Sequence, residues 1–194
     1  MNHGCLTTVP RPNGKVRNGT RRVLLVRRKH AWADPGWKTM IIVFFDSCGI
    51  VHKEFVPPGE TVNQAFYKDV LKCLWKRVQP VLRDITDDWV LQHDNVPAHT
   101  ALSTREFLAK KNIPVLPHSP YSPDLAPYDF CLFSKLKSKL MGHHFGTMDN
   151  IQEIVTDELY TLTENDFQYC YDQWKRHWNH CVTSQGSYFE GDNL

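Results

Sequence analysis

A continuous apolar run that ends in an aspartate constrains the fold of this chain more than any other feature. Met40–Phe45 holds six apolar residues, most of them β-branched or aromatic, directly before Asp46. The run lacks the alternation of a strand with one wet face, so it predicts a strand buried on both sides. Because such a strand needs helices on both faces of its sheet, the run predicts an α/β domain.

The segments that follow predict the rest of the domain. Ile50–Val56 alternates loosely after a turn at Ser47–Gly49, so we expect it to pair with the first strand as a hairpin. Thr61 and Gln64 form a capping-box pattern that opens a helix, and Pro80 is expected to close it. We expect further strands over 89–93 and 113–116, and further helices over 100–111, from 127, 151–159 and 167–178. Strands alternating with helices predict a mixed central sheet flanked by helices.

The first 38 residues differ from the rest in charge and in pattern. Residues 1–30 hold eight basic side chains and no acidic one, whereas the remaining residues carry 15 basic and 21 acidic side chains. We therefore expect a basic, poorly ordered arm over 1–38, with a short strand at Arg22–Val26, before a domain over 39–194. A basic arm on an acidic body indicates contact with a polyanion such as DNA. A solvated tail is the alternative.

The cysteines and the apolar runs indicate the compartment. No two of the six cysteines lie within ten residues of each other, which excludes the usual zinc patterns. We expect reduced, mostly buried thiols of an intracellular protein. With no apolar leader and no run of 18 apolar residues, we expect neither a secreted protein nor contact with a membrane. The basic cluster at Arg21–Lys29 is compatible with a nuclear address.

Three aspartates stand where strands end or a helix begins. Asp46 and Asp94 end predicted strands, and Asp129 lies in the first turn of a predicted helix; Asp124 is its equal on chemistry alone. If the two strands are neighbours, Asp46 and Asp94 reach one site outside the strand ends. Clustered carboxylates repel unless cations lie between them, and Mg²⁺ and Mn²⁺ prefer oxygen ligands. A surface turn or cap is the alternative for each aspartate taken singly.

The motifs around these aspartates resemble the mariner branch of the Tc/mariner DNA transposases. The matching segments are Val43–Asp46, His93–Asn95, Pro97–Thr100, Leu116–His118, Pro120–Phe130 and Gly186–Asp192. The resemblance runs from about Thr39 to Asp192 and implies an RNase H-like fold with a triad of aspartates. It places 34 residues between the second and third carboxylates, the gap between Asp94 and Asp129. This gap favours Asp129 over Asp124.

The resemblance also implies an activity, cofactors and partners. It implies a metal-dependent enzyme that cleaves DNA phosphodiesters and joins strands, with Asp46 contacting two Mg²⁺ or Mn²⁺ ions, Asp94 one of them and Asp129 the other. The implied partner is DNA, as transposon ends and as target. The partners that we consider also include a second copy of the chain in a homodimer. We expect the chain in the nucleus.

Neighbouring residues have two readings each. His93 and His99 are expected to cap and pack the site rather than to bind phosphate, and Asn95 to hold Asp94 by a hydrogen bond. The loop Tyr121–Leu125 is read as a structural or subunit contact. Lys135 and Lys139 are read as a solvated face rather than phosphate ligands, and Trp174 and Trp178 as core.

The chain also departs from the family pattern. Nothing like the helix-turn-helix modules that read transposon ends precedes Thr39, and the linker motif that helps such enzymes pair is not found. A non-catalytic DNA-binding relic is therefore the second hypothesis, and a poorly folding fragment is the third. The chain is also similar to the transposase half of a fusion with a histone methyltransferase, in which the third carboxylate is Asn. Asp129 is retained here, which favours nuclease chemistry, and we expect no methylation.

Overall fold

The computed structural model describes residues 22–31, 39–82, 89–141 and 147–185. Within them, five strands form one sheet in the order β3-β2-β1-β4-β5. The strands are β1 (Arg22–Ala31), β2 (Thr39–Asp46), β3 (Gly49–Val56), β4 (Trp89–His93) and β5 (Val115–Leu116). β2 pairs antiparallel with β1 and with β3, whereas β4 runs parallel to β1 and to β5. The mixed sheet expected from the sequence is therefore confirmed.

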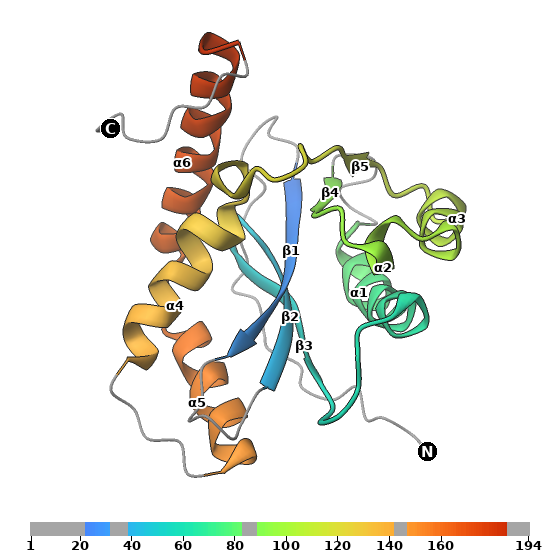
Figure 1. The fold of residues 1–194 in the computed structure, drawn as a ribbon, viewed down its shortest axis with the longest axis vertical. Coiled ribbons are helices and arrows are strands. Elements are labelled where there is room, and N and C mark those ends of the chain that lie inside the picture. Colours follow the sequence, from blue (N-terminus) through green and yellow to red (C-terminus); the bar gives the residue numbers. More distant parts are fainter. Residues whose placement is uncertain (1–21, 32–38, 83–88, 142–146, 186–194) are drawn as a thin grey trace.

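Helices cover both faces of this sheet. They are α1 (Gln64–Leu82), α2 (Pro97–Thr100), α3 (Leu102–Lys110), α4 (Phe133–Leu140), α5 (Met148–Tyr160) and α6 (Glu164–Thr183), with a 3-10 turn η1 (Pro123–Leu125) and a π-helical turn η2 (Tyr128–Leu132). Figure 1 shows α1, α2 and α3 on one side of the sheet and α4, α5 and α6 on the other. The domain thus has three layers, helix, sheet and helix.

The apolar run of β2 connects the two halves of the core. Val43 and Phe45 belong to the cluster formed with α4, α5 and α6, whereas Ile42 and Phe44 belong to the cluster formed with α1 and α3. All four side chains are at most 1% exposed. The prediction of a strand buried on both faces is confirmed.

The start of the sheet corrects the expected boundary at residue 38. β1 spans ten residues, not the short strand Arg22–Val26, and it lies between β2 and β4 with hydrogen bonds to both. Its basic second half, Arg27–Lys29, masks the strand pattern in the sequence. Backbone pairing on both edges holds a strand in place whatever its charge pattern. Residues 1–21 of the expected arm lie outside the described residues.

Three helix boundaries also differ from expectation. α1 begins at Gln64, where the Oδ1 atom of Asn63 accepts hydrogen bonds from the backbone of Ala65 and Phe66. Asn63 is therefore the capping residue in place of Thr61, in keeping with the preference for Asn at this position. The helix also continues two residues beyond Pro80. The helix expected over 100–111 is divided at Ala101 into α2 and α3.

The cysteines correct a second expectation. Cys131 in η2 and Cys170 in α6 are both buried, lie 5.6 Å apart at their Cα atoms and form a disulfide. The expectation of reduced thiols throughout is wrong for this pair, because the fold brings together two residues that are 39 apart in sequence. Cys48, Cys73 and Cys181 are thiols, as expected, and Cys5 lies outside the described residues.

None of the helices that the structure describes combines the length and the apolar character needed to cross a membrane.

Candidate functional site

The end of β4 is tied to the proline-rich loop that follows β5. The side-chain amide of Gln92 donates to the carbonyl of Leu125 at 3.3 Å and lies 3.4 Å from Nδ1 of His118. Asn95 donates from Nδ2 to the carbonyl of His118 at 2.8 Å. Asn95 thus fastens the loop, instead of holding Asp94 as the sequence suggested. Gln92 was not among the residues singled out from the sequence. A polar amide that directly follows the apolar residues of a predicted strand is the signal that could have found it, because such an amide is buried and needs hydrogen-bond partners.

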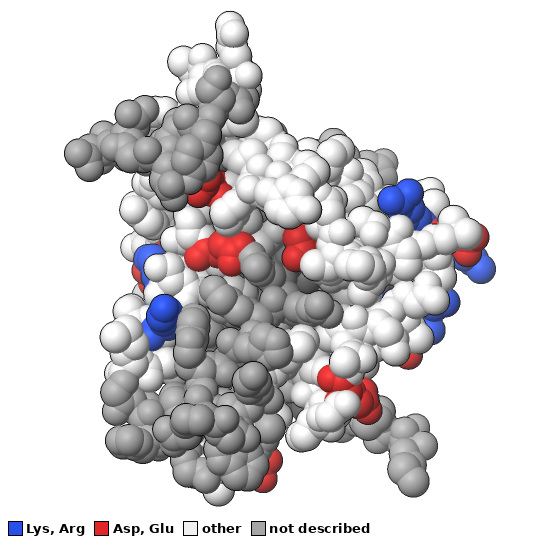
Figure 2. Space-filling model, viewed as in Figure 1, with Lys and Arg blue, Asp and Glu red and all other residues white. Residues whose placement is uncertain are grey.

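This connection brings the segments of two of the three expected aspartates to the same edge of the sheet. Asp94 directly follows β4, and Asp129 lies in η2, a few residues after Leu125. Figure 2 shows acidic side chains on both sides of the centre of this face, where Figure 1 places the end of β4 and the start of α4. The basic side chains drawn in this view lie toward its edges. Carboxylates gathered in this way favour a cation among them.

Asp94 is embedded among aromatic rings. Its Oδ1 atom lies 2.7 Å from Nδ1 of the buried His99 on α2, and the backbone of Val96 donates to the same oxygen at 3.5 Å. His93 donates from Nδ1 to the carbonyl of Asp94 at 2.9 Å, because a carbonyl oxygen can only accept. Burial, and then the neighbouring His99, lower the pKa of His93 to about 4. His93 is therefore neutral at physiological pH, and both histidines pack the site.

Asp46 does not share this arrangement. Its Oδ1 atom accepts hydrogen bonds from the backbone N–H groups of Cys48 at 2.8 Å and Gly49 at 3.1 Å. The side chain is 3% exposed and closes the turn between β2 and β3, where Gly49 has a positive φ of 144°. Asp46 thus takes the turn role that was the alternative for any single aspartate.

The strand register separates Asp46 from Asp94. Phe45 and Gln92 lie level with each other on either side of Leu25 in β1. β2 and β4 run in opposite directions from that level, so Asp46 and Asp94 are displaced roughly 10 Å along the strands and roughly 10 Å across them. Two catalytic metal ions lie only about 3.5–4 Å apart. The expectation that Asp46 bridges both ions is wrong in this geometry, because β1 lies between β2 and β4.

The donor set fits one hard cation better than two. No group of three histidine, cysteine, aspartate or glutamate side chains that could hold a metal ion occurs within the described parts of the chain. β1, which lies beside β4 where β2 was expected, contains no acidic residue. Mg²⁺ commonly binds through one or two carboxylates and takes water and phosphate as its other ligands. Asp94 and Asp129 would supply the carboxylates of such a site.

A cavity opens beside Asp94, between β4, β5 and α3. It encloses about 330 Å³, and its polar lining includes His93, Asn95, His99, Arg105 and His118. Leu108, Ile113 and Leu116 contribute part of its apolar wall. A partly apolar hollow with one arginine in its lining therefore lies next to the residues that flank Asp94.

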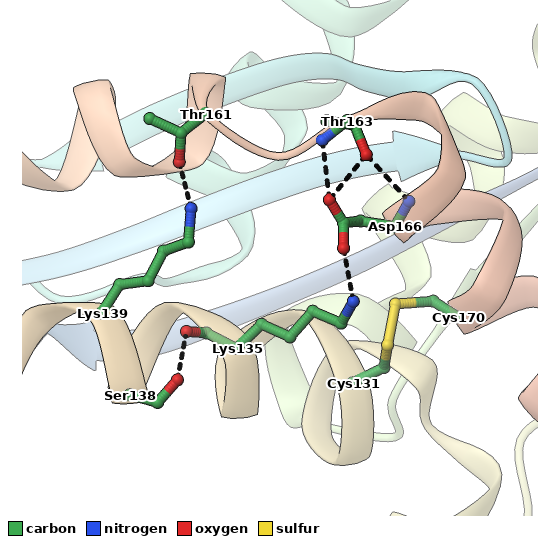
Figure 3. A network of polar contacts seen from close by, with 8 residues as sticks. All are labelled: Cys131, Lys135, Ser138, Lys139, Thr161, Thr163, Asp166 and Cys170. Atoms are coloured by element: carbon green, nitrogen blue, oxygen red, sulfur yellow. Dashed lines mark hydrogen bonds and ion pairs between the residues drawn. A yellow bond between two sulfur atoms is a disulfide. The ribbon is translucent and has the colours of Figure 1, made fainter.

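Lys135 and Lys139 are engaged within the protein, not a free solvated face. Figure 3 shows both reaching from α4 to the junction of α5 and α6. Lys135 donates to Asp166 at 2.6 Å, and Lys139 contacts Thr161 and lies 3.6 Å from Glu158. Neither reading of these lysines in the sequence anticipated this structural role.

The loop before η2 contacts α6 through the backbone near Leu125, whereas Tyr121 in the same loop is exposed. Trp174 donates from Nε1 to the carbonyl of Leu125 at 3.0 Å and is buried, and Trp178 packs against the same core, so the expectation that both are core residues is confirmed. His177 donates to the carbonyl of Asp124 at 2.6 Å. Tyr121 is fully exposed and has a positive φ of 55°.

Comparisons with known proteins agree with this architecture. No protein-family model matches the chain. The mariner Mos1 transposase of Drosophila mauritiana is 33% identical over 181 residues, which cover 84% of this chain and 52% of Mos1. The histone-lysine N-methyltransferase SETMAR of Homo sapiens is 28% identical over 79% of this chain and 23% of its own length. The chain thus spans about half the length of Mos1.

The solved structures give the same result. The Mos1 catalytic domain with raltegravir and Mg superposes with a TM-score of 0.81 at 32% identity, covering 88% of this chain and 86% of that domain. Similar structures of Mos1 include a paired-end complex with Mn. The RNase H-like fold implied by the sequence is confirmed by this likeness. The chain belongs to the mariner family of DNA transposases and corresponds to their catalytic domain.

Proposed function

We propose that the chain acts on DNA as a mariner transposase catalytic domain, cleaving phosphodiesters and joining strands with a divalent cation held by Asp94 and Asp129. The observation that carries this proposal is the connection of the β4 end to the loop before η2, which brings the segments that carry Asp94 and Asp129 to one edge of the sheet. The match to 86% of the Mos1 catalytic domain supports it.

The residues of the site would each have a defined part. Asp94 and Asp129 would hold Mg²⁺ or Mn²⁺, which supplies an activated water and stabilises charge on the attacked phosphate. The hollow beside Asp94, with Arg105 in its lining, would receive the DNA backbone next to the scissile bond. A second ion would need a third carboxylate, which Asp46 does not provide from its hairpin turn.

Partners and compartment follow from the same proposal. DNA, as transposon ends and target, would be the substrate, and the paired-end complex of Mos1 supports a homodimer as the working assembly. The four basic residues of segment 1–21 would add contacts to phosphates without much sequence readout. We also propose the nucleus as its compartment, because the basic cluster at Arg21–Lys29 resembles a nuclear address.

Cleavage of a supercoiled plasmid with Mn²⁺ tests the proposal. We expect nicking by the chain and at least a 100-fold loss in Asp94→Ala. Glu60→Ala, at an exposed position outside the site, is the matched control and should retain activity. Nicking that persists in Asp94→Ala would show a contaminating nuclease or another site.

A second candidate is a DNA-binding relic without catalysis. The specific observation in its favour is that β1, the strand beside β4, carries no carboxylate and that Asp46 closes a turn. Salt-sensitive DNA binding that is unchanged in Asp94→Ala, with no cleavage under either metal, would favour the relic over the enzyme.

A further inference from the structure

His99 is a buried polar side chain beside the proposed metal ligand Asp94. Its ring lies against the ring of Tyr67 in a tilted arrangement, with 3.9 Å between ring centroids and an interplanar angle of 34°. His93 meets it edge-on at 5.0 Å. The side chain of His99 is 1% exposed. Packing on two sides therefore leaves the imidazole little freedom to turn.

The same ring faces the carboxylate of Asp94. Nδ1 of His99 lies 2.7 Å from Oδ1, while the Asp94 side chain is 19% exposed. The contact is close but not linear, because neither ring nitrogen of His99 makes an aligned hydrogen bond among the described residues. Hydrogen bonds in active sites are often misaligned before the ligand binds and tighten when it does. A buried imidazole without an aligned partner costs stability, so the place of His99 beside Asp94 needs an explanation.

We propose that His99 is a positioning residue that fixes the carboxylate of Asp94 for a divalent cation. An ionised carboxylate can only accept a hydrogen bond. His99 must therefore carry a hydrogen on Nδ1 and donate a hydrogen bond from it to Oδ1 of Asp94. This orients Asp94 from the protein side before the cation arrives, as hydrogen bonds to metal-bound carboxylates do elsewhere. The inference rests on the proposed function, because it requires that Asp94 binds the cation.

The alternative is that His99 serves only as a packed ring. Substitutions at this one position separate the two roles. His99→Phe keeps an aromatic ring against Tyr67 and removes the donor. His99→Asn loses the ring but keeps an N–H donor the same number of bonds from the backbone as Nδ1. His99→Gln places its donor where Nε2 stands, away from Oδ1.

The test measures the dissociation constant for Mn²⁺ of the unsubstituted chain and of the three variants, by the electron paramagnetic resonance signal of free Mn²⁺. We expect His99→Phe and His99→Gln to weaken Mn²⁺ binding by about 10-fold or more. His99→Asn should stay within about 3-fold of the unsubstituted chain. Thermal unfolding of each variant verifies that it folds, and if His99→Phe does not, Asn against Gln decides the question.

Two results would overturn the inference. Equal Mn²⁺ affinity in His99→Phe and the unsubstituted chain would mean that the ring only packs. Equally weak binding by the Asn and Gln variants would mean that the donor position has no effect. Asp94→Asn separates this failure from that of the proposed function: if the unsubstituted chain binds no Mn²⁺, or if Asp94→Asn binds it equally well, the metal site itself is wrong.

Discussion

His52 on β3 is a buried histidine far from the candidate site in sequence. It is 2% exposed, stacks on Phe44 at 5.9 Å, and neither ring nitrogen has an aligned hydrogen bond within the described residues. Burial, and then the charge of Arg77, lower the pKa of His52 to about 4. Glu54 lies 3.5 Å from Nε2 but is 43% exposed, so water screens its carboxylate.

This histidine should make stability depend on mild acid. The folded state resists protonation while the unfolded state takes a proton near the ordinary pKa of 6.5, so stability is complete above 6.5 and falls as pH drops toward 4. Between pH 7 and pH 5 the loss due to His52 is about 2 kcal/mol. His52→Phe should remove that part of the loss in urea unfolding at the two pH values. An unchanged pH dependence in His52→Phe would contradict the assignment.

Asp46 offers a second prediction at this scale, because its oxygen has a partner in the turn. Asp46→Asn keeps an acceptor at Oδ1 for Cys48 and Gly49, whereas Asp46→Ala removes it. We expect Asp46→Ala to lose about 1–2 kcal/mol of unfolding free energy, and Asp46→Asn much less. Both should bind Mn²⁺ as the unsubstituted chain does. Weaker Mn²⁺ binding by Asp46→Asn, with stability intact, would restore Asp46 as a metal ligand.

At the scale of elements, the junction of α4 with α6 depends on one carboxylate. Asp166 accepts from the backbone and the hydroxyl of Thr163 in a capping box and from Lys135 of α4 (Figure 3). The Lys135 ammonium, and then Thr163, hold the pKa of Asp166 well below its usual range. Its stabilising effect is therefore complete at neutral pH and is lost only in strong acid, as pH falls through that lowered pKa.

Removing this carboxylate should loosen the start of α6. Asp166→Ala should cost about 1–2 kcal/mol of unfolding free energy at pH 7, most of it from the cap, since both partners of the ion pair are 32% exposed. Asp172→Ala is the matched control, because its pair with Lys175 is exposed on one helix and should contribute under about 0.5 kcal/mol. Equal losses in the two variants would show that the capping box contributes nothing measurable.

The sequence predicted elements with a strong period better than those defined by pairing. Met40–Phe45 is apolar throughout and revealed β2, whereas β1 was underestimated because Arg27–Lys29 interrupts its pattern. The same difference applies to the residues of the candidate site. Motif spacing predicted that Asp94 and Asp129 act together, and the structure ties their segments. Asp46 was misplaced because strand order is not written in local sequence, and one inserted strand moves a carboxylate far from its expected neighbour.

On the scale of the whole molecule, charge is divided between an acidic centre and a basic beginning. Acidic side chains gather near the middle of the face in Figure 2, so this surface repels DNA unless cations bind there. Residues 1–21 carry Arg11, Lys15, Arg17 and Arg21 with no acidic side chain. If these four contact phosphates, DNA affinity should come from the beginning of the chain and cleavage from its centre.

Two deletions separate the fold from the charge. Removing residues 1–21 leaves β1 in place, so this variant should unfold cooperatively, while the salt slope of its DNA affinity falls by up to about 3.6. Removing residues 1–38 also deletes β1, which leaves β2 and β4 without their common neighbour and exposes two strand edges. We expect this shorter variant to aggregate or to lose its cooperative thermal transition. If it instead unfolds cooperatively at the temperature of the full chain, β1 is not part of the stable sheet, and the domain begins near Thr39 as the sequence first suggested.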